Sequence, residues 1–293
     1  MSAVLHTTVV AEPVAGYRLS LRRFARNRLA VAGLAVVVLF LLFCFVGPLL
    51  YSTDQTHTDL TQVNLAPGAA HLLGTDAVGH DELGRLMYGG KISLLVGLAS
   101  GLLATVIGTL WGAVAGYAGG WVDAVMMRVV DAGIAIPALF ILLVVSAITS
   151  PGALGLIVIL GLVSWLVPSR LVRAETLTLK NRDYVLTLRA TGGTHGRAIL
   201  RHILPNSVST IVVAATFQVA DAILLVAYVS YLGLGVQPPS TDWGGMLSAG
   251  LTAAYSGRWW LIVPPGLAII LVVCAFNAIG DGLRDAFDVR GRA

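Results

Sequence analysis

Charged residues and cysteines are scarce in this sequence, and both shortages narrow the class of protein. Only 12% of its 293 residues are charged and 57% are hydrophobic, whereas soluble globular domains carry roughly 25% charged residues. The two cysteines, Cys44 and Cys274, lie inside apolar runs, so they form neither a disulfide framework nor a CxxC metal pair. The composition excludes an ordinary soluble domain and indicates an integral membrane protein.

Motifs for catalysis and metal binding are also missing. Residues 84–93, GRLMYGGKIS, fail the phosphate-loop pattern, because Arg85 occupies its first glycine position and Ile92 follows Lys91. The sequence contains neither GxSxG nor HExxH. Three histidines lack the spacing of metal ligands: His57, His71 and His80. We therefore expect no catalytic residue, no metal site and no cofactor on this chain, which is not expected to be an enzyme.

Long apolar runs dominate what is present. Crossing a hydrocarbon core about 30 Å thick takes ~20 apolar residues in a helix, and a helix satisfies its backbone hydrogen bonds without water. Six stretches meet or approach that length: 29–50, 92–117, 130–148, 153–172, 208–235 and 259–279. The turn-forming TSPG at 149–152 joins two of them into a helical hairpin. The sequence predicts an all-α membrane protein with six transmembrane helices.

Lysine and arginine are unequally distributed between the two sides of this topology. They concentrate before the first span, between the fourth and fifth spans and after the sixth, whereas the opposite side holds only Arg85, Lys91 and Arg258. Because positively charged loops remain in the cytoplasm, both termini and the central loop are expected there. A net charge of +4 then indicates orientation in a membrane rather than nucleic-acid binding.

Residues 17–30, just before the first span, place apolar residues on one face and arginines on the other. This pattern is typical of a helix lying in the membrane interface, although an ordinary basic flank would look the same.

Small residues follow one ridge of the second span. Ser93, Gly97 and Gly101 recur every four residues, and Gly108, Gly112 and Gly116 continue after a shift. Such a ridge lets neighbouring helices approach closely in lipid, so we interpret it as a packing surface.

Asp221 is an acidic residue near the middle of the fifth span. Charged groups at this depth are costly and usually functional. Either the carboxylate faces a translocation path, or it bonds to a neighbouring helix or a partner subunit.

The basic segment, residues 182–206, reads RDYVLTLRATGGTHGRAILRHILPN. The glycines of TGGT predict a bend between two short helices, and Pro205 predicts a break before the fifth span. Apolar positions lie among the basic ones: Tyr184, Val185, Leu188, Ile199, Leu200 and Ile203. A helix of this kind could dock into a groove on a soluble partner, and the alternative is a solvated loop that only sets topology.

The stretch ATGGTHGRAILRHILPN within the basic segment resembles the cytoplasmic loop of ABC-importer permeases known as the EAA loop. Four further stretches, 71–94, 116–137, 231–247 and 276–290, are similar to the second permease subunit of dipeptide, oligopeptide and nickel importers. The resemblance implies a type I ABC-importer transmembrane domain of six helices with an N-terminal interfacial elbow helix. It implies a tail and elbow helix at 1–28, the permease domain at 29–281 with its coupling loop at about 173–207, and a C-terminal tail at 282–293.

The same resemblance implies a peptide-importing permease of the bacterial inner membrane. Its partners would be a homologous permease subunit, two cytoplasmic ATPase subunits that carry ATP and magnesium, an extracytoplasmic solute-binding protein and the lipid bilayer, with no nucleic acid. The alternatives are an ion-coupled carrier that uses Asp221, or a nickel- or haem-specific member of the family. The sequence departs from the family where Leu186, Thr187 and Leu188 replace acidic and small residues, and where Val226 replaces a glutamate.

Two sets of site residues follow from the resemblance. The set that contacts the ATPases comprises Asp183, Tyr184, Arg189, Ala190, Gly192, Gly193, Ile199, Arg201, His202 and Pro205. The set that faces the binding protein comprises Gln237, Pro238, Pro239, Asp242 and Trp243.

Overall fold

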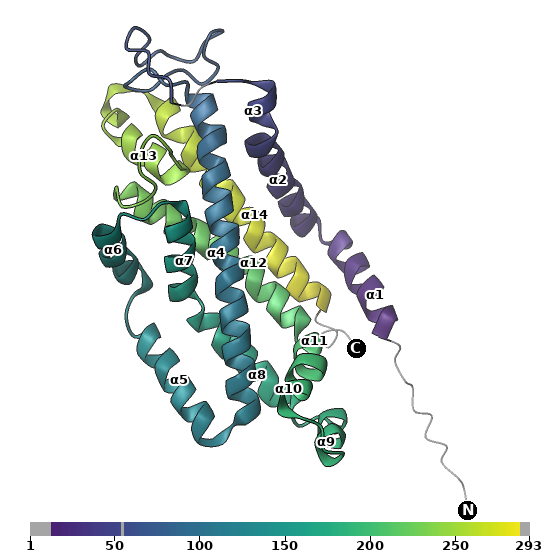
Figure 1. Cartoon of the computed structure of the whole chain (residues 1–293). Helices are drawn as coiled ribbons and strands as arrows, with labels where there is room; N and C mark the ends of the chain where they lie inside the picture. The colour runs from purple at the N-terminus through teal and green to yellow at the C-terminus, as the bar shows by residue number, and fades with distance from the viewer. Residues whose placement is uncertain (1–12, 54–55, 288–293) are drawn as a thin grey trace, which may run out of the picture.

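The computed structural model describes residues 13–53 and 56–287 as a bundle of helices (Figure 1). Among the described residues there is no β-strand, only one isolated bridge between Thr75 and Asp81. Four of these helices are long and apolar enough to cross a membrane, and two bent pairs of helices also meet that test. Counting each bent pair as one span gives six, as the sequence predicts. The outer parts of both expected tails, 1–12 and 288–293, lie outside the described residues.

Asn27 separates a short first helix from the first span. Its side-chain oxygen accepts hydrogen bonds from the N–H groups of Leu29 (3.1 Å) and Ala30 (3.2 Å). This cap begins α2 (Arg28–Phe45) and leaves α1 (Pro13–Arg26) as a separate helix, where the sequence predicts the elbow helix. The expected first span continues past α2 as a short helix, α3 (Gly47–Leu50).

The second span is longer than the apolar pattern indicates. Helix α4 (Glu82–Ala118) begins well before residue 92. The Asp81 carboxylate caps it by accepting a hydrogen bond from the Gly84 N–H (2.8 Å), and the Arg85 guanidinium pairs with Asp76 of the preceding loop (2.6 Å). Because the loop supplies partners for these polar turns, hydropathy alone does not detect them.

The third and fourth spans are bent, which the apolar pattern of the sequence does not indicate. The axes of α5 (Gly120–Ile134) and α6 (Ala138–Thr149) differ by 74°, and those of α7 (Ala153–Ser164) and α8 (Leu166–Leu179) differ by 45°. Pro137 has no backbone N–H and disfavours helical geometry at the residue before it, which accounts for the first bend.

Two ion pairs join α5 to α8. The Nε and Nη2 atoms of Arg173 donate to the two carboxylate oxygens of Asp123 at 2.5 and 2.6 Å. Arg170, one turn before Arg173 on α8, pairs with Asp131 of α5. Since these four charges have partners, α5 begins earlier and α8 ends later than the apolar runs at 130–148 and 153–172.

The fifth and sixth spans are single helices. α12 (Val208–Tyr231) ends before residue 235, because Gly233 adopts a left-handed φ of 79° that terminates helices. α14 (Val263–Phe287) begins after residue 259 and continues past 279 and past the expected domain boundary at 281. The elements between them are α13 (Trp243–Leu251) and two 3₁₀ turns, η2 (Ala254–Ser256) and η3 (Trp259–Leu261).

The small-residue ridge of α4 brings two different helices close. A Cβ added to Gly101 would lie 2.8 Å from the Val219 Cα on α12, and one added to Gly112 would lie 2.3 Å from the Ser169 carbonyl oxygen on α8. The first half of the ridge therefore seats α12 and the second half seats α8. This confirms the packing interpretation and explains why the glycine pattern shifts between Gly101 and Gly108.

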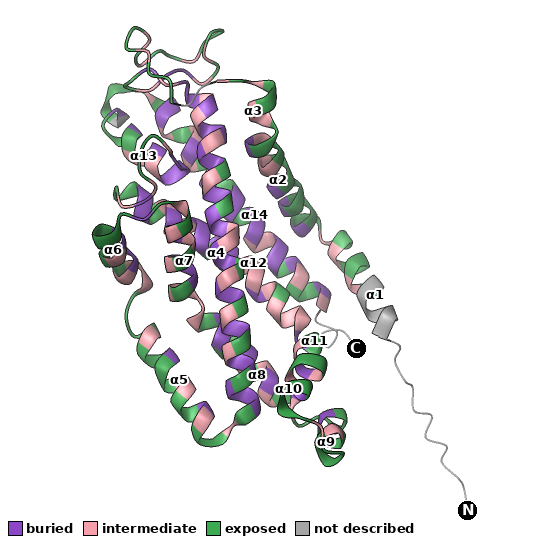
Figure 2. Ribbon diagram, in the orientation of Figure 1, coloured by how far each residue is buried: buried purple, intermediate pink, exposed green. Residues whose placement is uncertain are grey.

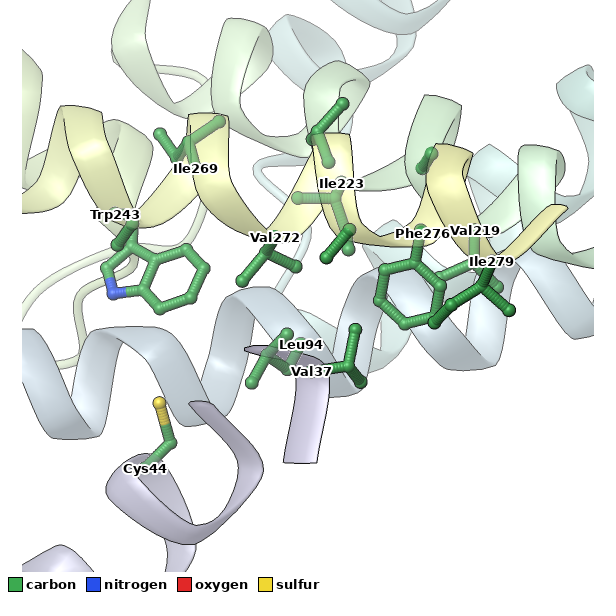
Figure 3. Packing of buried hydrophobic residues seen from close by; sticks show 14 of the residues in the cluster. Val37, Cys44, Leu94, Val219, Ile223, Trp243, Ile269, Val272, Phe276 and Ile279 are labelled. Atoms are coloured by element: carbon green, nitrogen blue, oxygen red, sulfur yellow. The ribbon is translucent and has the colours of Figure 1, made fainter. Parts of the chain in front are cut away.

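The main apolar cluster lies where α2, α4, α12, α13 and α14 meet (Figure 3). Leu94, Ile223, Val272 and Trp243 are almost fully buried there. Figure 2 shows burial concentrated along α4 and its neighbours, while much of α2 is exposed. Fully burying one such side chain contributes roughly 1.5–3 kcal/mol in water; in a bilayer, close packing replaces much of that driving force.

Candidate functional site

The basic segment forms a series of short helices at one end of the bundle (Figure 1). α9 (Asp183–Ala190) is followed by a turn, then by α10 (His195–Ala198), one π-helical turn η1 (Ile199–Ile203) and α11 (Leu204–Asn206). The opposite end of the bundle carries the loop before α4 and helix α13. The segment is thus a helix–turn–helix unit, as its sequence predicts.

The bend between the two helical parts lies at the predicted glycines. Gly192 has a φ of 80°, a conformation that side chains disfavour. The Gly193 N–H donates to the Leu188 carbonyl (2.9 Å), and the Gly192 N–H donates to the Arg189 carbonyl (3.1 Å). This pair of bonds is a Schellman motif, which satisfies the last carbonyls of α9 and fixes the direction of the turn.

Part of the apolar face of the segment packs inward. Val185, Ala198 and Ile203 are fully buried, and they cluster with Tyr117 at the end of α4 and Leu179 at the end of α8. The sequence grouped Val185 and Ile203 with the apolar positions available for docking. Their burial corrects that grouping, because they anchor the segment to its own bundle.

Aromatic rings reinforce this anchor. The Tyr117 ring lies 5.5 Å from the His195 ring in an edge-on arrangement, and the Arg189 guanidinium lies 5.9 Å from its centroid. The rings of Tyr184 on α9 and His202 on η1 lie 6.2 Å apart. These contacts connect both arms of the segment to each other and to α4.

Other side chains of the segment point outward. Tyr184 is 42% exposed, Leu186 is 45% exposed and Leu200 is 65% exposed. Four exposed arginines lie among them: Arg182, Arg189, Arg197 and Arg201. Of the remaining residues in the predicted coupling set, Asp183, Ala190, Gly192 and Pro205 are exposed, while Gly193, Ile199 and His202 are partly buried. The outward surface is therefore apolar and basic, and it includes Leu186, one of the departures from the family pattern.

The predicted break at Pro205 is only a one-residue irregularity. Pro205 lies in the first turn of α11, where its missing N–H costs little. The π-helical turn η1 precedes it, and a π turn often accommodates an irregularity in a helix. Ser207 alone separates α11 from α12, and its hydroxyl donates to the Ile203 carbonyl (3.0 Å). The segment thus continues directly into the fifth span.

A pocket of ≈ 360 Å³ lies where the third and fourth spans bend. Its lining is drawn from residues 133–138 and 163–167 at the two bends and from residues 218–228 of α12. We call it the bend pocket. Asp221 lines it, together with Gln218, Ser164 and Tyr228.

Asp221 is exposed in this single chain. Within the described residues, no hydrogen bond or ion pair joins its carboxylate to a neighbouring side chain. Bonding to a neighbouring helix of this chain is therefore not seen, which leaves the translocation path and a partner subunit as the two interpretations.

At the opposite end, two residues predicted to face a binding protein are interior. Asp242 is 1% exposed and caps α13, where its carboxylate accepts hydrogen bonds from the Gly245 N–H (2.9 Å) and the Ser230 hydroxyl (2.6 Å). Trp243 is fully buried, and its Nε1–H donates to the Leu86 carbonyl (3.0 Å). Asp242 and Trp243 therefore fix α13 in place instead of forming outer surface. The rest of the predicted set is exposed: Gln237, Pro238 and Pro239.

The loop before α4 is held by side-chain hydrogen bonds. The His71 ring lies 2.8 Å from the Asp81 carboxylate and 2.7 Å from the Gln62 side-chain oxygen. The Tyr51 hydroxyl also donates to Asp81 (2.9 Å), and the Trp260 indole donates to the Thr75 carbonyl (3.3 Å). His71, which lacks metal-ligand spacing, has a structural explanation in these contacts.

A second polar group fixes the same loop to α4. Asp76 accepts from Arg85 (2.6 Å) and lies 2.8 Å from the His80 ring. Burial alone raises the pKa of the Asp76 carboxyl, but the hydrogen bonds from His80 and Val78 and the charge of Arg85 outweigh it, so the pKa lies below its usual range. The carboxylate is thus charged at neutral pH and keeps its partners.

Comparison with known proteins decides the family. A family model described as "Binding-protein-dependent transport system inner membrane component" matches residues 108–292. The N-terminal TM domain of oligopeptide transport permease C matches residues 17–67. The first match covers more than half of the chain. The chain belongs to the binding-protein-dependent transport permeases.

Individual relatives of this permease agree with that assignment. A protein of Brucella suis biovar 1 (strain 1330), named as a peptide permease, is 44% identical over 272 residues, which cover 92% of this chain and 90% of the relative. The dipeptide transport system permease protein of Bacillus subtilis (strain 168) is 38% identical over 92% of this chain and 85% of its own. The oligopeptide transport system permease protein of the same organism is 37% identical over 92% of this chain and 88% of its own.

Family membership identifies the permease as a multi-pass component of the inner membrane with the type I ABC-importer fold. Its role is that of a membrane permease subunit rather than an enzyme. The alternative of an ion-coupled carrier is not favoured, since the family name describes a system with a separate binding protein.

Some functional candidates in the permease are not apparent from its sequence. The ion pairs between α5 and α8 were not predicted, although Asp123 precedes and Asp131 begins the expected third span, and Arg170 and Arg173 lie at the end of the fourth. The pattern that predicts them is acidic residues near one helix of a predicted hairpin and basic residues on the other. No comparable sequence pattern marks Ser164 and Gln218 as functional, because isolated polar residues are common in membrane spans.

Proposed function

We propose that this permease imports peptides as one half of an ATP-driven transporter. The relatives named for peptide, dipeptide and oligopeptide transport support the substrate class. A homologous permease subunit completes the pathway, and two ATPase subunits bind ATP and magnesium beneath the pair. A solute-binding protein delivers the peptide to the opposite face.

The observation that carries this proposal is the construction of the basic segment. Its inward face is anchored on Tyr117 and Leu179, its outward face is apolar and basic, and it continues into α12 through Ser207 alone. A soluble ATPase that binds the outward face would displace α12 when it moves, because no flexible loop intervenes. The predicted coupling residues, from Asp183 to Pro205, lie on or beside this face.

The orientation follows from the same proposal. The basic segment and both termini lie in the cytoplasm, in keeping with the concentration of arginine at that end. The exposed Gln237, Pro238 and Pro239 then face the binding protein on the outer side.

Two alternatives make predictions that differ from this proposal. An ion-coupled carrier that uses Asp221 would not need an ATPase. A nickel- or haem-specific member of the family would discriminate against peptides, whereas the relatives reported above are named for peptide transport.

Uptake by the assembled complex in proteoliposomes tests the proposal. With loaded binding protein outside and ATP inside, radiolabelled peptide should accumulate, and accumulation should stop when ATP is replaced by a non-hydrolysable analogue. An ionophore that dissipates ion gradients should leave uptake intact. Uptake that needs no ATPase and collapses with the ionophore would instead establish the ion-coupled carrier, and ATP-dependent uptake of nickel chelates or haem without peptide uptake would overturn the substrate class.

A further inference from the structure

The bend pocket contains polar groups that have no partners within the chain. The Ser164 hydroxyl is buried and makes no hydrogen bond in the described part of the structure. Gln218 is 7% exposed, and its side-chain amide likewise has no hydrogen-bond partner among the described residues. The Asp221 carboxylate is exposed in this single chain and also has no hydrogen-bond or ion-pair partner among the described residues. Unsatisfied polar groups at this depth are costly, so their gathering around one pocket indicates a polar ligand.

The charge of the pocket restricts the ligand. Its lining contains one acidic residue, Asp221, and no lysine, arginine or histidine. The nearby bases of α8, Arg170 and Arg173, are paired with Asp131 and Asp123. The pocket therefore carries a net negative charge and favours a cationic group.

The number and kind of polar groups in the pocket match an ammonium group. An ammonium has three N–H donors, and three acceptors line the pocket: the Asp221 carboxylate, the Gln218 amide oxygen and the Ser164 hydroxyl. Along α12, Gln218, Asp221, Leu225 and Tyr228 follow one helical face. Leu225 thus adds an apolar wall beside Asp221, and the phenol of Tyr228 can donate to a carbonyl.

We propose that the bend pocket binds the protonated α-amino group of the passing peptide, with Asp221, Gln218 and Ser164 as its three acceptors. Leu225 contacts the first peptide side chain, and the Tyr228 hydroxyl donates to the first peptide carbonyl. This inference rests on the proposed function, since it takes the ligand to be a peptide. It makes the membrane domain itself selective for a free N-terminus.

Chemical protection tests this without ATP or binding protein. The complex is purified with Cys274→Ser and Leu225→Cys, placed in nanodiscs and labelled with a maleimide. Trialanine is compared with propionyl-Ala-Ala, which lacks only the amino group. Trialanine should slow labelling of the Leu225→Cys site, and the propionyl analogue should need at least about tenfold higher concentration, the factor expected for losing a charge-assisted hydrogen bond.

Variants of Asp221 separate binding from assembly. Asp221→Asn should abolish the difference between the two peptides, while Asp221→Glu should retain most of it. Asp281→Asn, which removes an exposed acid of α14 outside the pocket, should behave like the parent.

Equal protection by the two peptides in the parent complex would overturn the inference, as would an unchanged difference in Asp221→Asn. Loss of the assembled complex in both Asp221 variants would overturn it in favour of a contact with the partner subunit. The labelling needs no ATP, so equal protection by the two peptides would not argue against ATP-driven uptake. Conversely, a complex that shows the protection difference but takes up no peptide would refute only the transport proposal.

Discussion

Tyr117 connects the basic segment to the membrane-spanning part of the bundle. Its side chain is 8% exposed and contacts both the His195 ring and the Arg189 guanidinium. Its hydroxyl is buried and has no hydrogen-bond partner among the described residues. The aromatic ring rather than the hydroxyl therefore holds the segment in place.

Two substitutions at Tyr117 should have opposite consequences. Tyr117→Ala removes a buried ring, which costs about 3–5 kcal/mol in protein cores, and should release the segment from α4. Tyr117→Phe removes only an unpaired hydroxyl and should be nearly neutral. Trypsin cleavage at the exposed arginines of the basic segment measures the release: Tyr117→Ala should be cleaved at least about tenfold faster than the parent. Equal cleavage of the two variants would show that the ring is not the anchor.

Single residues also mark the limit of prediction from sequence. The bend at Gly192 and Gly193 was predictable, because paired glycines after a helix have a local conformational cause. The burial of Asp242 and Trp243 was not. Their partners, Ser230 and Leu86, are 12 and 157 positions away, and an aspartate and a tryptophan in a loop between spans have the composition of an exposed surface.

At the level of elements, α4 is the helix on which the others are arranged. It packs against α7, α8 and α12, and its glycines set how close α8 and α12 come. Displacement of either helix therefore requires sliding along a glycine-lined surface, which offers little steric resistance. This suits a protein whose helices must change position during transport.

Gly112→Ala tests the close approach of α4 and α8. Its Cβ would lie 2.3 Å from the Ser169 carbonyl oxygen, so the helices must separate. We expect the apparent melting temperature of the detergent-solubilised complex to fall by several degrees, the shift expected for a loss on the order of 1–2 kcal/mol. Gly152→Ala is the matched control, because no atom lies within 4 Å of its added Cβ. Equal melting temperatures for the two variants would refute the packing role of the ridge.

The spans show what hydropathy predicts and what it leaves out. It located all six, because the bilayer imposes a length of apolar sequence. Hydropathy did not reveal the bends of the third and fourth spans, because a window of apolar residues contains no information about direction. Hydropathy also placed the start of α4 too late in the sequence, since the partners of the first polar turns of α4 lie in a loop that folds back onto the helix.

At the scale of the whole molecule, one continuous path links the basic segment to the bend pocket. The basic segment leads through Ser207 into α12, α12 carries Asp221 into the bend pocket, and both bent spans line the same pocket. The ion pairs of Asp123 and Asp131 join α5 to α8 below it. A force applied to the basic segment would therefore reach the pocket by movement of packed helices, with no flexible connection to absorb it.

The most direct measurement of this central claim is the number of peptides transported per ATP hydrolysed by the reconstituted complex. Leu200→Glu places a charge on the exposed apolar surface of the basic segment, where Leu200 is 65% exposed. Thr178→Glu places the same charge on an exposed position of α8 just outside it. We predict that Leu200→Glu lowers the ratio at least about tenfold, the effect of losing a central interface contact, while Thr178→Glu leaves it unchanged and both variants assemble. An unchanged ratio in an assembled Leu200→Glu complex would contradict the assignment of the basic segment as the site that receives work from ATP hydrolysis.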